Sequence, residues 1–94
     1  MLRKKFDYGL ILVERLKRAE GLFLDVGTVA KEHKVSMAYL EKIAQELKRA
    51  GFMESRRGRD GGYRLTREVS IAELMRFFER PFEFCPIGRL KIKS

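Results

Sequence analysis

The pattern of apolar and polar positions predicts a long amphipathic helix at the start of the chain. Over residues 4–19, apolar side chains recur at spacings of three and four, as on one face of a helix, and Gly21 ends the pattern. The expected inward stripe consists of Phe6, Leu10, Val13 and Leu16. Tyr8, Ile11 and Leu12 lie beside that stripe. We therefore expect this wide apolar face to contact another chain or the C-terminal segment as well as the core.

Two shorter helices are expected next, each preceded by a residue that can cap it. After the extended stretch "LFLD", Asp25 can accept a hydrogen bond at the start of a helix that runs to about His33. Ser36 can do the same for a helix over residues 37–50, which Gly51 ends. The apolar positions expected to form the core are Val26, Val29 and Ala30 in the first of these helices, and Leu40, Ile43, Ala44, Leu47 and Ala50 recur at helical spacing in the second. Two such helices joined by a tight turn are typical of a helix-turn-helix.

A β-hairpin and a fourth helix are predicted to follow. The strands "FMESRR" and "YRLTR" flank a loop of about five residues that contains Gly58, Gly61 and Gly62. Ser70 and Glu73 have the spacing of a capping box, and Pro81 stops the helix that they begin. The sequence thus predicts an α+β, mainly helical fold, a winged helix-turn-helix with a two-stranded wing. We expect this domain to span residues 1–80, followed by a short aromatic and basic segment over 81–94.

The charge of the chain favours a polyanionic partner. Its 94 residues include 21 Lys and Arg against 13 Asp and Glu, a formal net charge of +8. Basic side chains that contact phosphates release condensed counterions, so a balance of this size is typical of nucleic-acid binding. Because a basic protein with another role can have the same net charge, the sequence motifs are needed to distinguish a nucleic-acid-binding protein from other basic proteins.

The second helix of the helix-turn-helix supplies the first candidate contacts with DNA. Its outward positions are Ala38, Glu41, Lys42, Gln45, Lys48 and Arg49. Lys42 and Lys48 suit phosphates. Glu41 can accept a hydrogen bond from the amino group of cytosine, and Gln45 can pair with adenine. We therefore expect this helix to enter the major groove.

The hairpin loop supplies the second group of candidate contacts. Arg56, Arg57 and Arg59 surround Gly58, and an arginine at a wing tip can insert into the narrow minor groove. A solvated turn with arginines for solubility is the alternative. A nucleotide-binding loop is excluded because "GRDGGY" lacks the Gly-Lys-Ser/Thr ending and lies between two strands.

Residues 36–68, "SMAYLEKIAQELKRAGFMESRRGRDGGYRLTRE", resemble the Rrf-two family of bacterial winged-helix transcription regulators. The shared features are a Ser-x-x-Tyr-Leu-Glu start of the recognition helix, a Leu-x-x-x-Gly end and an Arg-Gly-x-x-Gly-Gly-Tyr wing. Weaker likeness extends from "KKFDYGL" to "SIAELMRFFE". The resemblance implies a dimeric regulator that binds palindromic promoter DNA.

The resemblance also implies roles for particular residues. Glu41 matches the glutamate that takes part in base discrimination, and Arg57 matches the wing arginine that enters the minor groove. Arg59 and Asp60 stand where many relatives have proline and glycine. The full set of candidate DNA-binding residues is Ser36, Ala38, Tyr39, Glu41, Lys42, Gln45, Lys48, Arg56, Arg57, Gly58, Arg59 and Arg64.

The sequence gives no donor set for a cofactor or a metal. Cys85 is the single cysteine, so the chain resembles a short form of the family without the three-cysteine loop that holds an iron–sulfur cluster and without the long dimerisation helix. Cys85 is interpreted as a partly buried apolar residue, with a redox-sensing or residual ligand thiol as the alternative. His33 has no companion at ligand spacing and is expected at a helix end. No nucleophile stands beside a base, so the chain is not expected to be an enzyme.

The sequence-based hypothesis is a cytoplasmic, homodimeric regulator, a repressor, that binds specific double-stranded DNA. Asp7 and Glu14 interrupt the first apolar run, so neither a signal peptide nor a membrane span is expected there. The first helix and the aromatic stretch over residues 78–87 are the candidate dimer surfaces. The alternatives are a winged-helix protein-interaction module and a non-specific binder of nucleic acids, RNA included. The operator and the effector are not given by the sequence.

Overall fold

Four helices and one antiparallel hairpin make up the structure, a computed structural model that describes residues 3–79. In chain order the elements are α1 (Arg3–Arg18), α2 (Val26–His33), α3 (Met37–Arg49), β1 (Met53–Arg56), β2 (Gly62–Leu65) and α4 (Ile71–Glu79). Every element expected from the sequence is present, with small shifts at its ends. The predicted winged helix-turn-helix is therefore confirmed, whereas the segment 81–94 lies outside the described residues.

The caps of the two helix-turn-helix helices form as the sequence predicts. The Asp25 carboxylate accepts a hydrogen bond of 3.2 Å from the N–H of Thr28 at the start of α2. The Ser36 hydroxyl oxygen accepts one of 3.1 Å from the N–H of Tyr39 at the start of α3. Both caps satisfy N–H groups that have no partner inside the helix. These contacts fix where the two helices begin.

The fourth helix starts with the reciprocal capping box that the sequence predicts. The N–H of Ser70 donates to the Glu73 carboxylate at 3.0 Å, and the N–H of Glu73 donates to the Ser70 hydroxyl at 3.1 Å. The first of these bonds is the main reason that the pKa of Glu73 lies below its usual value. Arg67 adds an ion pair of 2.9 Å to the same carboxylate. Residues 67–73 therefore anchor the start of α4.

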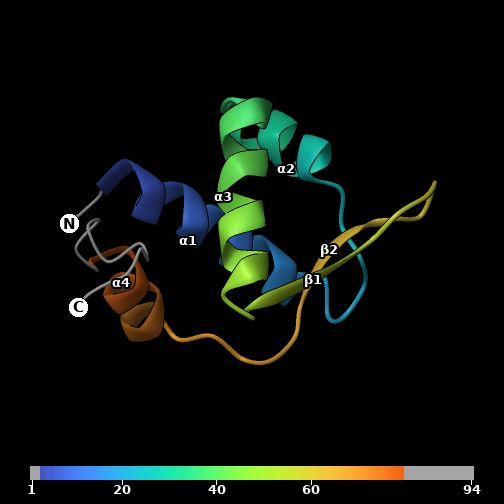
Figure 1. Cartoon of the computed structure of the whole chain (residues 1–94). Helices are drawn as coiled ribbons and strands as arrows, with labels where there is room; N and C mark the ends of the chain where they lie inside the picture. The colour runs from blue at the N-terminus through green and yellow to red at the C-terminus, as the bar shows by residue number, and fades with distance from the viewer. Residues whose placement is uncertain (1–2, 80–94) are drawn as a thin grey trace.

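The α3 helix occupies the centre of the molecule, and the other elements pack around it (Figure 1). Helices α1 and α4 lie on one side, α2 crosses at one end, and the wing extends away on the other side. Leu40, Ile43 and Leu47 of α3 are completely buried, as the sequence predicts. They meet α1, α2 and the base of the wing. The inward side of α3 is thus fully covered, and its opposite side faces solvent.

The buried face of α1 differs from the stripe predicted by the sequence. Leu12, expected beside the stripe, is 0% exposed, whereas Phe6 and Leu10, expected in it, are only half-buried. Gly9 explains the difference, because a Cβ atom there would lie 2.7 Å from Cε2 of Phe78 in α4. The missing side chain lets α4 approach α1 closely, and α1 turns its Gly9 side inward. A pattern of apolar side chains does not register glycine as an inward position.

The structure also corrects one of the proposed dimer surfaces. Phe78, expected at the start of an aromatic surface, is 3% exposed and belongs to the core of this domain. Its ring meets the ring of Phe77 edge to face at 4.9 Å. Residues 80–87 of that proposed surface, and Cys85 with them, lie outside the described residues. Phe78 therefore stabilises the domain and is not part of a surface that a second chain could cover.

The position of Leu12 leads to a test of the buried face of α1. We expect Leu12→Ala to lower the free energy of unfolding by about 2 to 5 kcal/mol, because it removes a fully buried side chain and leaves a cavity. Leu10→Ala is the matched control, and it should cost about 1 kcal/mol, since Leu10 is half-exposed. Urea denaturation followed by circular dichroism measures both values. Equal losses in the two variants would contradict the assigned face.

Candidate DNA-binding surface

The turn between α2 and α3 sets the helix-turn-helix geometry. Lys34 adopts the left-handed conformation, with φ 55°, and its N–H donates to the carbonyls of Ala30 and Lys31. The N–H of Val35 also donates to the Ala30 carbonyl, at 3.0 Å. These bonds close the end of α2 and redirect the chain into α3. The exposed residues of α3 are Met37, Ala38, Lys42, Gln45, Lys48 and Arg49, and Glu41 is half-buried beside them.

The wing is a hairpin whose loop has the predicted length. Met53 pairs with Leu65 and Arg56 with Gly62, which leaves the five residues 57–61 in the loop. The N–H of Gly61 donates to the carbonyl of Gly58 at 3.0 Å, so residues 58–61 form a tight turn. Gly58 has φ +109°, a conformation that side chains disfavour. The glycine-rich sequence is thus explained by the shape of the tip.

A backbone bridge that the sequence analysis missed attaches the wing to the segment before α2. The N–H of Leu24 donates to the carbonyl of Tyr63 at 2.8 Å, and the N–H of Tyr63 donates back to Leu24 at 2.9 Å. Gly62 permits this approach, because it has φ +141° and a Cβ atom there would lie 2.3 Å from the Leu24 carbonyl oxygen. In the sequence, the extended stretch "LFLD" was the only local indication that a bridge could form here. Strand β2 of the wing therefore lies between β1 and Leu24.

Two of the candidate arginines are held against the wing by an aromatic ring. The guanidinium groups of Arg56 and Arg64 lie 4.3 Å and 4.5 Å from the centre of the Phe23 ring. Arg56 also donates a hydrogen bond of 3.0 Å to the carbonyl of Asp60, and Arg64 forms an ion pair with Glu54. Arginine stacked on an aromatic ring is attracted by the π electrons and covers apolar surface. Phe23 was not among the candidates from the sequence.

The wing, α3 and the start of α2 surround an open groove of about 630 Å³. Seven of the candidate residues line it, namely Glu41, Gln45, Lys48, Arg56, Arg57, Gly58 and Arg59. The lining residues that the sequence analysis missed are Asp25, Val26, Thr28, Ser55, Gly61, Gly62 and Tyr63. Arg57 and Arg59 are exposed and make no hydrogen bond or ion pair with residues 3–79. Two unpaired cations thus lie beside the exposed side of α3.

The remaining candidate residues lie outside the groove. Ser36 caps α3, and Ala38 and Lys42 are exposed along it. Tyr39 points to the α1 side instead, where its ring meets that of Tyr8 edge to face at 4.8 Å. The Lys4 ammonium group lies 4.8 Å from the centre of the Tyr39 ring. Tyr39 is therefore half-buried against α1, and Arg64, the fifth residue outside the groove, is held at Phe23.

A hydrogen-bonded triad connects the recognition side of α3 with the wing. The Tyr63 hydroxyl donates to Oε2 of Glu41 at 2.8 Å. The Gln45 amide nitrogen donates to the Tyr63 hydroxyl oxygen at 2.9 Å and to Oε2 of Glu41 at 3.2 Å. Burial of Tyr63, which is 6% exposed, and its bond to the carboxylate raise the pKa of the phenol well above its ordinary value. The contacts join residues 18 and 22 positions apart, so no local pattern predicts them.

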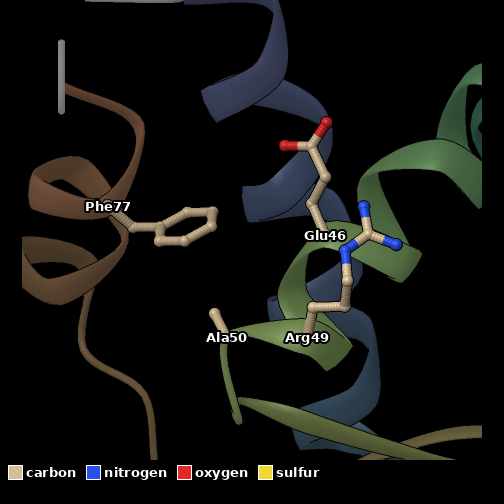
Figure 2. A pocket seen from close by; sticks show the side chains of 4 residues that line it. All are labelled: Glu46, Arg49, Ala50 and Phe77. Atoms are coloured by element: carbon tan, nitrogen blue, oxygen red, sulfur yellow. The ribbon is translucent and has the colours of Figure 1, made fainter. Parts of the chain in front are cut away.

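A second hollow, of about 320 Å³, lies between the end of α3 and α4. Glu46, Arg49, Ala50 and Phe77 line it, and the Phe77 ring points from α4 toward α3 (Figure 2). The Glu46 carboxylate is paired with Lys5 at 3.0 Å. This hollow therefore has one cation, Arg49, in its lining, whereas the groove at the wing has four. The groove at the wing is the better candidate for a polyanion.

Comparisons with known proteins identify similar transcription regulators. The family model "Rrf2: Iron-dependent Transcriptional regulator" matches residues 2–92. The chain is 33% identical to the putative HTH-type transcriptional regulator rrf2-like of Rhodobacter capsulatus, over 92% of this chain and 62% of that protein. It is 36% identical to the HTH-type transcriptional regulator IscR of Cereibacter sphaeroides, over 83% and 54% respectively. The chain thus spans little more than half the length of these curated relatives.

Among solved structures, the chain is similar to CymR (YrzC), the global cysteine regulator of B. subtilis. The TM-score is 0.76 at 29% sequence identity, over 96% of this chain and 71% of that chain. A match at this level supports the winged-helix architecture. It also shows that the resemblance found in residues 36–68 extends over the rest of the described fold.

The description of the matching family as iron-dependent calls for a test of the donors in this chain. Within residues 3–79, no group of three or more His, Cys, Asp or Glu side chains could hold a metal ion. His33 is exposed at the end of α2, with Nδ1 3.2 Å from the Val29 carbonyl oxygen, and the single cysteine, Cys85, lies outside this range. The described residues therefore do not fit an iron site. None of the helices in residues 3–79 combines the length and the apolar character that a membrane span needs.

The bridge to Leu24 can be tested by adding one methyl group. Gly62→Ala places a Cβ atom against the Leu24 carbonyl, so we expect the amide hydrogens of Leu24 and Tyr63 to exchange with solvent about ten-fold faster or more. Gly58→Ala is the control, because it also has a positive φ but its Cβ would meet nothing within 4 Å. Hydrogen exchange measured by NMR distinguishes them. The same change in both variants would contradict a role for the bridge.

Proposed function

The chain belongs to the Rrf2 family of transcriptional regulators, and from that premise we propose that this domain binds double-stranded DNA through α3 and the wing. The family consists of regulators and not enzymes, as the sequence analysis expects. The observation that carries the proposal is the groove in which the exposed side of α3 and the unpaired arginines of the wing tip meet. We propose a cytoplasmic site of action, because promoter DNA is found there.

The exposed side of α3 would enter the major groove. Lys42 and Lys48 would contact phosphates on the two sides of the helix, because both are exposed. Glu41 and Gln45 lie between them and would face base edges. Ser36 and Ala38 are exposed at the start of the helix, which is the part that approaches the bases in helix-turn-helix complexes. Tyr39 would support the helix from the α1 side.

The wing would lie along the adjacent minor groove. Arg57 and Arg59 have no partners among residues 3–79, so their guanidinium groups can bind DNA without breaking an existing contact. Arg57 directly precedes Gly58 at the tip, and we propose that it enters the minor groove, where a narrow groove strengthens the negative potential. Arg56 and Arg64, which are stacked on Phe23, would keep the wing in position.

We propose that the regulator acts as a two-fold dimer and as a repressor. A two-fold dimer would place two α3 helices about one turn of DNA apart and would match a palindromic site. The half-buried apolar residues Phe6, Leu10 and Ile11 of α1 are the dimer surface that remains among the described residues. Occupation of a promoter by such a dimer would exclude the polymerase. Transcription in vitro from a bound promoter, with and without the protein, tests this step.

The wing makes a prediction about the choice of DNA sequence. We expect Arg57→Ala to weaken binding by about ten-fold, more on duplexes with A/T-rich flanks than on G/C-rich ones, and to lower the slope of log K against log salt by about one. Fluorescence anisotropy at several salt concentrations measures both quantities. Arg76→Ala removes the same charge from an exposed residue of α4, which lies on the other side of the molecule from the wing (Figure 1).

The same titrations separate the proposal from its alternatives. Equal losses for Arg57→Ala and Arg76→Ala would mean that only net charge matters and would remove the wing from the mechanism. No binding to duplex DNA would favour a protein-interaction module. Equal affinity for duplex DNA and for structured RNA would favour a non-specific binder of nucleic acids.

A further inference from the structure

The hydrogen atoms of the triad have a single consistent arrangement. An ionised carboxylate only accepts hydrogen bonds, so the Gln45 amide must direct its amino group, and not its oxygen, toward Glu41. The Tyr63 hydroxyl has one hydrogen, which it donates to Glu41, so it must accept from Gln45. The amino group of Gln45 is therefore turned toward Tyr63 and Glu41, and its oxygen is turned away from them.

This arrangement leaves two oxygens free to face DNA, Oε1 of Glu41 and Oε1 of Gln45. Both are acceptors. Paired contacts between glutamine and adenine need one donor and one acceptor, and here the amino group that would donate faces Tyr63 and Glu41. We propose that Tyr63 is a specificity-determining residue that holds Glu41 and Gln45 as a pair of hydrogen-bond acceptors. The inference deepens the proposed function and rests on it.

A pair of acceptors selects bases by a simple rule. In the major groove, cytosine presents the N4 amino group and adenine presents the N6 amino group, and each can donate to a free oxygen. Guanine presents O6 and N7, and thymine presents O4 and a methyl group, so an acceptor pair would face acceptors or carbon. The triad would therefore favour cytosine or adenine on the contacted strand and disfavour guanine and thymine.

The surroundings of Tyr63 keep the acceptor pair in place. Its ring is buried, its backbone N–H and carbonyl are both bonded to Leu24, and Ser55 of β1 lies opposite it in the hairpin register. The phenol is protonated at neutral pH and able to donate to Glu41, and burial together with this bond raises its pKa further. The hydroxyl group can move only if the wing moves. Base choice by α3 is thus tied to the position of the wing.

The test removes the hydroxyl group and measures base preference. Selection of bound duplexes from a randomised library gives the preference at each position for the whole chain and for Tyr63→Phe, which keeps the buried ring. We expect the variant to release the amino group of Gln45 from one of its two partners, and the discrimination against guanine and thymine at one position should fall about ten-fold. Affinity for non-specific duplexes should stay within about two-fold. Tyr8→Phe is the matched control, because it removes a tyrosine hydroxyl outside the groove.

A second variant keeps the test valid if Tyr63→Phe fails to fold. Glu41→Gln changes a half-buried residue of α3 without changing its size, introduces a donor next to Gln45 and should relax the same preference. The titration of the tyrosines by ultraviolet absorbance needs no DNA: Glu41→Gln should lower the pKa of Tyr63, whereas Glu46→Gln, whose partner is Lys5, should not. Either variant binding with the original base preference would overturn the proposal, and so would an unchanged titration in Glu41→Gln. If the original chain binds DNA without sequence preference, the proposal that α3 contacts base edges is wrong, and this inference fails with it. The tyrosine titration would still show whether the Tyr63 hydroxyl is bonded to Glu41.

Discussion

The geometry of the candidate site depends on Tyr63, which binds two separate parts of the helix-turn-helix. Its backbone pairs with Leu24 before α2, and its hydroxyl donates to Glu41 in α3. A hairpin of two short strands has little stability of its own, so these contacts determine its direction. They also determine the groove, because the wing forms one of its sides. A winged helix without them would keep its core and lose the fixed angle between wing and helix.

The elements of the fold were predictable because their signals are local. Ser36 and the Ser70–Glu73 pair indicate helix starts within a few residues, and the glycines of residues 58–62 indicate a turn. The buried face of α1 was not predictable in the same way. It depends on the contact between Gly9 and Phe78, which are far apart in the sequence, and on the absence of a side chain. Long-range packing of this kind overrides the apolar pattern.

The candidate site was predicted as a set of residues but not as an arrangement. The arginines of the wing look equivalent in the sequence, and yet Arg56 is stacked on Phe23, whereas Arg57 has no partner among residues 3–79. Glu41 and Gln45 were recognised from their helical spacing. Their connection to Tyr63 was missed because it depends on how the hairpin folds back over α3. The sequence therefore predicts which side chains are present at the surface and not which of them are already engaged.

The triad has a consequence for how such a regulator can diverge in evolution. A substitution at Gln45 or Glu41 changes the hydrogen bonding of the other residue and leaves a buried hydroxyl to be satisfied, so each position constrains the other. The side chains of Ala38 and Lys42 are exposed on the same helix and make no hydrogen bond with residues 3–79. They can mutate one at a time without such a penalty. In duplicated copies of this gene, new target sites would be acquired first through these unconstrained positions.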